Sequence, residues 1–108
     1  MEYVRGAKVK EKVYNLLLEI PDGFVTTYGI IAETLGNKRL ARVVGNILHQ
    51  NEDGDKYPCY KVVNSSGNLA CHYAFGGIDG QKKRLENDGI VVQNNKVSKD
   101  YFYYFNHE

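Results

Sequence analysis

Short apolar-periodic segments separated by strong stop signals constrain the fold of this chain most. In the first segment the apolar residues recur at helical spacing, at Val9, Val13, Leu16, Leu17 and Ile20. The sequence Pro21-Asp22-Gly23 then forms a turn that a helix cannot cross. The pattern predicts an amphipathic helix up to Ile20, followed by a short extended link over residues 24–26.

Two more helices are expected before residue 50. Thr27 is a good N-cap for a helix over residues 28–35, and Gly36 supplies a left-handed stop. Asn37 is a good N-cap for the next helix. The expected apolar face of that helix comprises Leu40, Val43, Val44, Ile47 and Leu48.

The outer face of the predicted third helix is basic and partly bare. It carries three polar and two small residues, namely Arg39, Arg42, Asn46, Ala41 and Gly45. Two helices joined by a tight turn, the second basic outside, are typical of the helix-turn-helix that enters DNA grooves. The alternative is an ordinary solvated face formed by Lys38, Arg39 and Arg42, and spacing alone does not distinguish the two.

The second half of the chain mixes short β segments with one helix. Residues 61–63 and 69–71 flank the turn-forming quartet Ser65-Ser66-Gly67-Asn68, which predicts a β-hairpin. A helix is expected over residues 78–88, closed by Gly89, with a small terminal hairpin around Asn94-Asn95.

Charge and composition exclude several classes of protein. The chain has 14 basic and 13 acidic residues, so DNA binding would need a local patch on a nearly neutral molecule. No run approaches the roughly 18 apolar residues of a membrane span. Two cysteines without an apolar leader favour the reducing cytoplasm. Cys59, Cys71, His49 and His72 lack the paired spacing of a zinc site, so no metal is expected.

One thiol, in Pro58-Cys59-Tyr60-Lys61-Val62, lies between the helical and the β-rich parts of the chain. A lone cysteine is more often a small buried hydrophobe than a nucleophile. Cysteine reacts as the thiolate, whose ordinary pKa is about 8.5, so the surroundings of Cys59 decide between the two alternatives.

Five ordered motifs together resemble the O6-alkylguanine-DNA alkyltransferases. They are residues 20–29 (IPDGFVTTYG), residues 41–45 (ARVVG), Asn51, residues 58–63 (PCYKVV) and residues 73–77 (YAFGG). The resemblance spans roughly residues 4 to 92 and implies one domain, residues 1–108, without the family's N-terminal domain. It implies a mainly α fold with a small β wing, a helix-turn-helix or winged-helix-like three-helix DNA-binding domain.

By this resemblance the protein flips an O6-alkylated guanine and takes the alkyl group permanently onto Cys59. Arg42 matches the finger that fills the gap left by the base, and Tyr28 matches the residue that crowds the target phosphate. Thr27, next to Tyr28, is also expected to contact DNA. Ala41 and Gly45 would permit close approach to the minor groove. No cofactor is implied.

Further positions match the family's pocket. Asn51 matches the hinge asparagine, the alternative being a simple Asx-turn residue. Leu48, Val62 and Tyr73 match pocket positions, with the Val62 carbonyl facing the guanine amine; as bare sequence, Leu48 and Val62 are core residues. Ala74 falls where the family often has serine, and Cys71-His72 where glycine is usual.

The family's proton relay is altered at two points. Tyr60 replaces the histidine after the acceptor, and Asp88 replaces the distal glutamate. Tyrosine does not accept a proton near neutrality, so transfer is expected to be slower by roughly 10²–10⁴-fold. Lys61, in place of arginine, is expected to lower the Cys59 pKa by proximity.

The leading interpretation is a monomeric, cytoplasmic repair enzyme that acts on duplex DNA containing O6-alkylguanine. The first alternative is an alkyltransferase-like protein, which binds the lesion and hands it to other DNA-repair proteins. That class lacks the acceptor cysteine, whereas this chain retains Cys59. A helix-turn-helix regulator with an incidental thiol would leave Asn51 and residues 73–77 unexplained.

Overall fold

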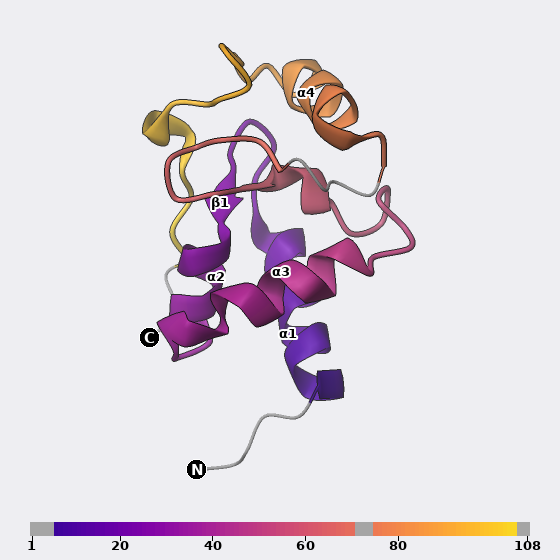
Figure 1. Cartoon of the computed structure of the whole chain (residues 1–108), viewed down its shortest axis with the longest axis vertical. Helices are drawn as coiled ribbons and strands as arrows, with labels where there is room; N and C mark the ends of the chain where they lie inside the picture. The colour runs from indigo at the N-terminus through magenta and orange to yellow at the C-terminus, as the bar shows by residue number, and fades with distance from the viewer. Residues whose placement is uncertain (1–5, 71–74, 106–108) are drawn as a thin grey trace.

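The computed structural model describes residues 6–70 and 75–105, and these parts are mainly helical with a small sheet (Figure 1). The α-helices in these parts are α1 (Gly6–Glu19), α2 (Tyr28–Thr34), α3 (Ala41–His49) and α4 (Gly77–Asn87). Short 3-10 turns are η1 (Lys38–Leu40), η2 (Cys59–Lys61) and η3 (Lys99–Tyr101), and the strands are β1 (Thr26–Thr27) and β2 (Val62–Val63). The expected fold class is confirmed.

The predicted start and stop signals act where the sequence places them. Thr27 Oγ1 accepts a hydrogen bond from Ile30 N at 2.9 Å, which caps α2. Gly36 has φ +102°, the left-handed conformation that ends this helix. Asn37 also caps as predicted, through Arg39 N at 2.9 Å, but it begins η1, and α3 follows directly.

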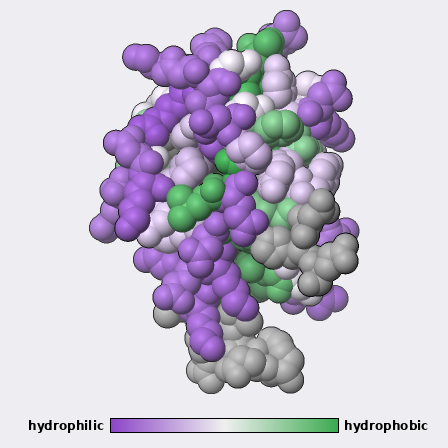
Figure 2. Space-filling model, turned by 180° about the vertical axis from the view of Figure 1, so that it is seen from behind, coloured by the Kyte–Doolittle hydropathy of each residue, from purple (hydrophilic) through white to green (hydrophobic). Residues whose placement is uncertain are grey.

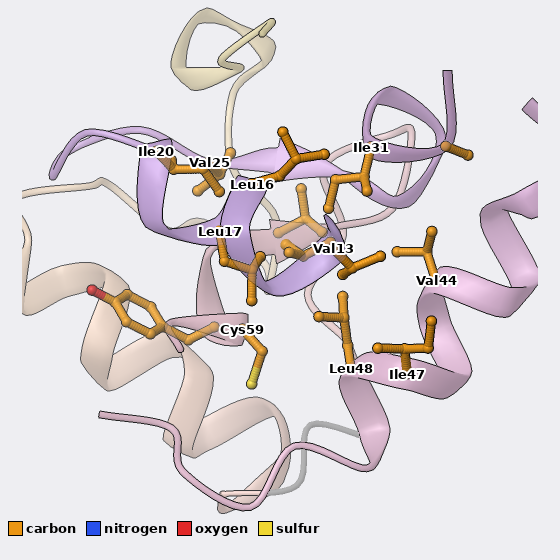
Figure 3. Close-up of a cluster of buried hydrophobic side chains, with 14 of the residues drawn as sticks. Val13, Leu16, Leu17, Ile20, Val25, Ile31, Val44, Ile47, Leu48 and Cys59 are labelled. Atoms are coloured by element: carbon orange, nitrogen blue, oxygen red, sulfur yellow. The ribbon is translucent and has the colours of Figure 1, made fainter. Parts of the chain in front are cut away.

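The core lies between α1, α2 and α3, where apolar side chains from all three helices meet (Figure 3). Its α3 stripe is Val44, Ile47 and Leu48. Val43, expected on this apolar face, is 39% exposed, so that prediction is wrong. The buried stripe follows the i, i+3, i+4 spacing from Val44, and Val43 falls beyond its edge.

The predicted hairpin of residues 61–63 with 69–71 is wrong for the described residues, and residue 71 lies outside them. Strand β2 pairs in parallel with β1, with Thr26 opposite Val62 and Thr27 opposite Val63. The predicted turn itself is present, because Asn64 Oδ1 accepts hydrogen bonds from Ser66 N and Asn68 N. The turn residues revealed a chain reversal, but they carry no information about which segment β2 pairs with.

The C-terminal segment, around residues 101–103, runs beside the start of β1 and is hydrogen-bonded to it. The predicted turn at Asn94-Asn95 is confirmed, since both residues have positive φ and Gln93 bridges Lys96. Farther on, Val25 N donates to Tyr101 O at 2.9 Å. The α4 prediction is confirmed within one residue at each end.

Small hydrophobic patches are separated by hydrophilic side chains on the face seen in Figure 2. Within residues 6–70 and 75–105, no helix has the length and apolar character to cross a membrane.

Candidate functional site

A pocket of about 860 Å³ lies beside α3, on the side of the segment that follows β2. It brings together many of the predicted site residues, namely Tyr28, Ala41, Arg42, Gly45, Leu48 and Cys59. Leu48 is also a core residue, as its bare sequence indicated. Tyr73 and Ala74, also predicted to line the pocket, lie outside the described residues.

Helices α2 and α3 position the outer part of the pocket. A Cβ added at Gly45 would lie 3.8 Å from Cδ1 and Cε1 of Tyr28, which is ordinary van der Waals contact, so the Tyr28 ring lies against this position of α3. Arg42 is exposed one turn earlier on α3. Thr27, predicted to contact DNA, is 3% exposed, and its hydroxyl accepts the capping hydrogen bond of α2 from Ile30 N.

Cys59 begins the turn η2, and its side chain is 6% exposed. Asn51 holds this turn from the end of α3. Its Nδ2 donates to Cys59 Sγ at 3.3 Å and to Tyr57 O at 2.9 Å, while its Oδ1 accepts from Asp53 N at 3.0 Å. The structure contains both interactions that the sequence left as alternatives, the bridge from Asn51 to the Cys59 turn and the Asx turn.

Burial raises the pKa of the Cys59 thiol. The hydrogen bond from Asn51, the backbone of Cys59 itself and the charge of Arg84 act in the opposite direction and do not cancel the effect of burial. The group in the pocket is therefore a thiol at neutral pH, with only a small thiolate fraction.

The Tyr60 hydroxyl points to Asp88 and donates to its Oδ2 at 2.5 Å. Burial raises the pKa of Tyr60, and the hydrogen bond and charge of Asp88 raise it further. A hydroxyl that is held protonated by a carboxylate cannot take a proton from Cys59. The two altered relay positions, Tyr60 and Asp88, are thus hydrogen-bonded to each other, but the pair does not provide a base for Cys59.

Lys61 was expected to lower the pKa of Cys59, but it is not among the groups that shift this pKa. Lys61 Nζ donates to Ile20 O and to Asp22 Oδ1, each at 3.0 Å, and so ties η2 to the end of α1. The cation that lowers the Cys59 pKa is Arg84 on α4. Arg84 also donates to Gly54 O at 3.0 Å.

Sequence reasoning missed both Arg84 and Gln81. Gln81 is fully buried in α4, and its amide binds the carbonyl of Val62. Val62 itself is buried in β2 and contributes no lining to the pocket beside α3 among the described residues. The spacing of Gln81, Arg84 and Asp88, which places them along one side of a helix, was the available signal.

Helices α2 and α3 have the arrangement of a helix-turn-helix, and the second of them borders a pocket lined by a buried thiol, which is the form of a DNA-binding domain with a candidate reactive group. Residues 8–90 match the family model described as "6-O-methylguanine DNA methyltransferase, DNA binding domain". The chain belongs to this family.

Relatives within the family differ in their described activity. The chain is 45% identical over 85 residues to a bifunctional methyltransferase/endonuclease of Picrophilus torridus, a match that covers 79% of this chain and 28% of the relative. It is 37% identical to alkyltransferase-like protein 1 of Schizosaccharomyces pombe, covering 75% of each. It thus spans less than a third of the first relative.

Two solved structures show the same likeness. S. pombe Atl1, in complex with damaged DNA containing O6-carboxymethylguanine, has a TM-score of 0.84 at 31% identity, covering 93% of this chain and 98% of Atl1. Mycobacterium tuberculosis OGT in complex with DNA has a TM-score of 0.70 at 32% identity, covering 81% and 52%.

Proposed function

We propose that this protein binds duplex DNA containing O6-alkylguanine and takes the alkyl group onto Cys59. The observation that carries the proposal is the presence of Cys59 in one pocket with Arg42 and Tyr28. A protein that reacts with a base must extrude it from the stack into a pocket that holds the reactive group. The pocket beside α3 has this arrangement.

In this proposal α3 enters the minor groove, where Ala41 and Gly45 permit close approach. The Arg42 guanidinium fills the space left by the extruded base, since it can stack and donate hydrogen bonds there. Tyr28 crowds the phosphate of the target nucleotide. Together these residues offset the few kcal/mol that unstacking a base costs.

The transfer itself is a displacement at the alkyl carbon. Cys59 Sγ forms a bond to that carbon, the bond from carbon to O6 breaks, and guanine keeps the electron pair. The thiol proton is lost to solvent or to the leaving base. Burial raises the Cys59 pKa, and the Tyr60 hydroxyl is hydrogen-bonded to Asp88. We therefore expect alkyl transfer to be roughly 10²–10⁴-fold slower than in a site that has a positioned general base.

The second candidate is lesion binding without transfer, followed by recruitment of other repair proteins. It is favoured by the Tyr60 to Asp88 hydrogen bond, which leaves Cys59 without help from Tyr60. The likeness to S. pombe Atl1 over nearly the whole of both chains points the same way. The retained thiol of Cys59 is why alkyl transfer ranks first.

Lesion capture is tested with the Arg42→Ala variant. Affinity for a duplex with one O6-methylguanine is compared with affinity for the same duplex with guanine, and exposed Lys83→Ala on α4 is the matched control. We expect Arg42→Ala to lose about tenfold in lesion affinity, while Lys83→Ala keeps it. Unchanged capture by Arg42→Ala would show that the assigned finger is wrong.

A further inference from the structure

Gln81 lies in α4, and its polar side chain has no exposed surface and contacts η2, the turn that begins at Cys59. Its Nε2 donates to Tyr60 O and Val62 O, both at 2.9 Å. Its Oε1 accepts from Ala70 N at 2.7 Å. Such a buried amide stays in place only because these hydrogen bonds replace the water it has lost.

The three partners of Gln81 lie on two different segments. Tyr60 and Val62 lie one and three residues after Cys59. Ala70 lies on the segment that follows the turn at residues 64–68. Both Cys59 and Ala70 line the pocket beside α3. The side chain of Gln81 therefore joins two walls of that pocket.

This bridge stands where backbone pairing would otherwise be expected. Strand β2 pairs with β1 and not with residues 69–70, so the carbonyl of Val62 and the N–H of Ala70 do not meet in a hairpin. Unpaired buried backbone groups cost free energy comparable to a lost hydrogen bond. The Gln81 amide supplies a donor to one segment and an acceptor to the other.

We propose that Gln81 is a positioning residue that sets the spacing between the Cys59 turn and the Ala70 wall, and thereby the selectivity of the pocket for the lesion. The inference rests on the proposed function, because it assumes that the alkylated base enters this pocket. Asp88 accepts a hydrogen bond from the Tyr60 hydroxyl in this turn, whereas Arg84 donates to Gly54 O in the loop that precedes it.

The amide chemistry makes the role testable by one isosteric change. In Gln81→Glu, the oxygen that replaces Nε2 would face the carbonyl oxygens of Tyr60 and Val62 when the carboxyl ionises. Burial and these two dipoles raise the pKa of such a carboxyl. When protonated, it donates to one carbonyl and still accepts from Ala70 N, so the bridge is present at acid pH and lost as the pH rises.

The ionisable groups on η2 and on the adjoining part of α4 have partners other than Gln81. On η2 they are Cys59 and Tyr60, whose pKa values are raised, so both stay neutral below neutrality. Lys61, also on η2, is held by Asp22 and Ile20 O, and on α4 Arg84 is held by Gly54 O and Asp55. Asp88 accepts from Tyr60 at the end of α4.

The experiment measures lesion selectivity, defined as the ratio of affinities for duplex DNA with and without one O6-methylguanine, from about pH 5 to about pH 8. Wild type, Gln81→Glu, Gln81→Met and the exposed control Gln93→Glu are compared. We expect Gln81→Glu to come nearest to wild type at acid pH, where the bridge from one carbonyl to Ala70 N remains, and to lose about tenfold in selectivity as its carboxyl ionises. Gln81→Met should lose selectivity at every pH, and Gln93→Glu should follow wild type.

Thermal melting at each pH identifies the range in which each variant is folded, and Gln81→Glu at acid pH serves as its own folded reference. If wild type is selective and Gln81→Glu keeps wild-type selectivity at all pH values, the proposal is overturned. A loss of equal size for damaged and undamaged DNA also overturns it, because that is the result of a purely structural role. Absence of selectivity in wild type would overturn the proposed function and this inference with it.

Discussion

At the scale of single residues, the reactivity of the site depends on how Cys59 is protonated. Burial makes its thiolate costly, and the surrounding groups recover only part of that cost. Asn51 donates directly to Sγ at 3.3 Å, which fixes the thiol in the pocket more than it ionises it. In the proposed transfer, Cys59 therefore acts as a buried thiol without help from Tyr60, whose hydroxyl is held by Asp88.

The raised pKa of Cys59 predicts the pH dependence of its alkylation by iodoacetamide. Below the pKa the thiolate fraction grows about tenfold per pH unit, so the rate should still be rising above pH ~8.5, the ordinary thiol value. A peptide of residues 57–63 should reach its plateau at lower pH, because its thiol is not buried. A plateau near neutrality in the folded protein would contradict this account.

The Tyr60→Phe variant tests whether the tyrosine takes part in proton transfer. Its hydroxyl donates to Asp88 and remains protonated, so its removal should change the rate of alkyl transfer by less than about threefold, far below the roughly 10²–10⁴-fold effect of losing a general base. The free energy of unfolding should fall by about 1 to 3 kcal/mol, as for a hydrogen bond to a charged group. Single-turnover kinetics and chemical denaturation measure the two effects, and a hundredfold loss of rate with intact folding would assign Tyr60 a catalytic role.

At the scale of elements, α3 has to bury one stripe and expose another. The buried stripe comprises Val44, Ile47 and Leu48, while Val43 lies at the surface with Arg42. The helix and its basic face were predictable from residue spacing. The width of its buried stripe was not, because η1 precedes α3 and tertiary packing decides which edge of the apolar face is covered.

Two neighbouring valines on α3 make this distinction measurable. Val43→Thr should change the free energy of unfolding by less than about 0.5 kcal/mol, because Val43 is exposed. Val44→Ala removes two buried carbons and should cost about 2 kcal/mol. Chemical denaturation of both variants gives the comparison, and equal losses in the free energy of unfolding would show that Val43 is packed in the core like Val44.

The β segments illustrate a different limit of sequence reasoning. Local signals placed both turns correctly, since Asn64 and the pair Asn94-Asn95 form them with their own side chains or backbone conformation. Strand pairing depends on which distant edge is free, and the partner of β2 is β1, more than 30 residues earlier. Helical spacing could mark the position of Gln81, but its hydrogen-bond partners depend on that pairing and required the folded chain.

At the scale of the whole molecule, charge is nearly balanced, with 14 basic and 13 acidic residues. In the proposed function, attraction to DNA then comes from the local basic face of η1 and α3, on which Lys38, Arg39 and Arg42 are exposed. The family resemblance predicts an acceptor, a finger and a hinge by motif. The contacts from α4 that shape their surroundings required the folded chain.

This distribution predicts a shallow salt dependence of DNA binding. Three exposed cations that neutralise phosphates correspond to a slope of about −3 for log affinity against log salt concentration. Titration of undamaged duplex DNA at several salt concentrations gives the slope. A value near −8 would indicate a much wider basic surface than this face of η1 and α3.

The central claim is that Cys59 accepts the alkyl group, and mass spectrometry tests it most directly. The protein is incubated with an excess of duplex DNA containing O6-methylguanine, and its intact mass and the Cys59 peptide are measured over time, with Cys59→Ser as the control. We predict one methyl group per protein, located on Cys59, with guanine restored in the DNA and no methyl group on Cys59→Ser. Lesion-selective binding without any methyl group on Cys59 would contradict transfer and identify the protein as a lesion-binding member of the family.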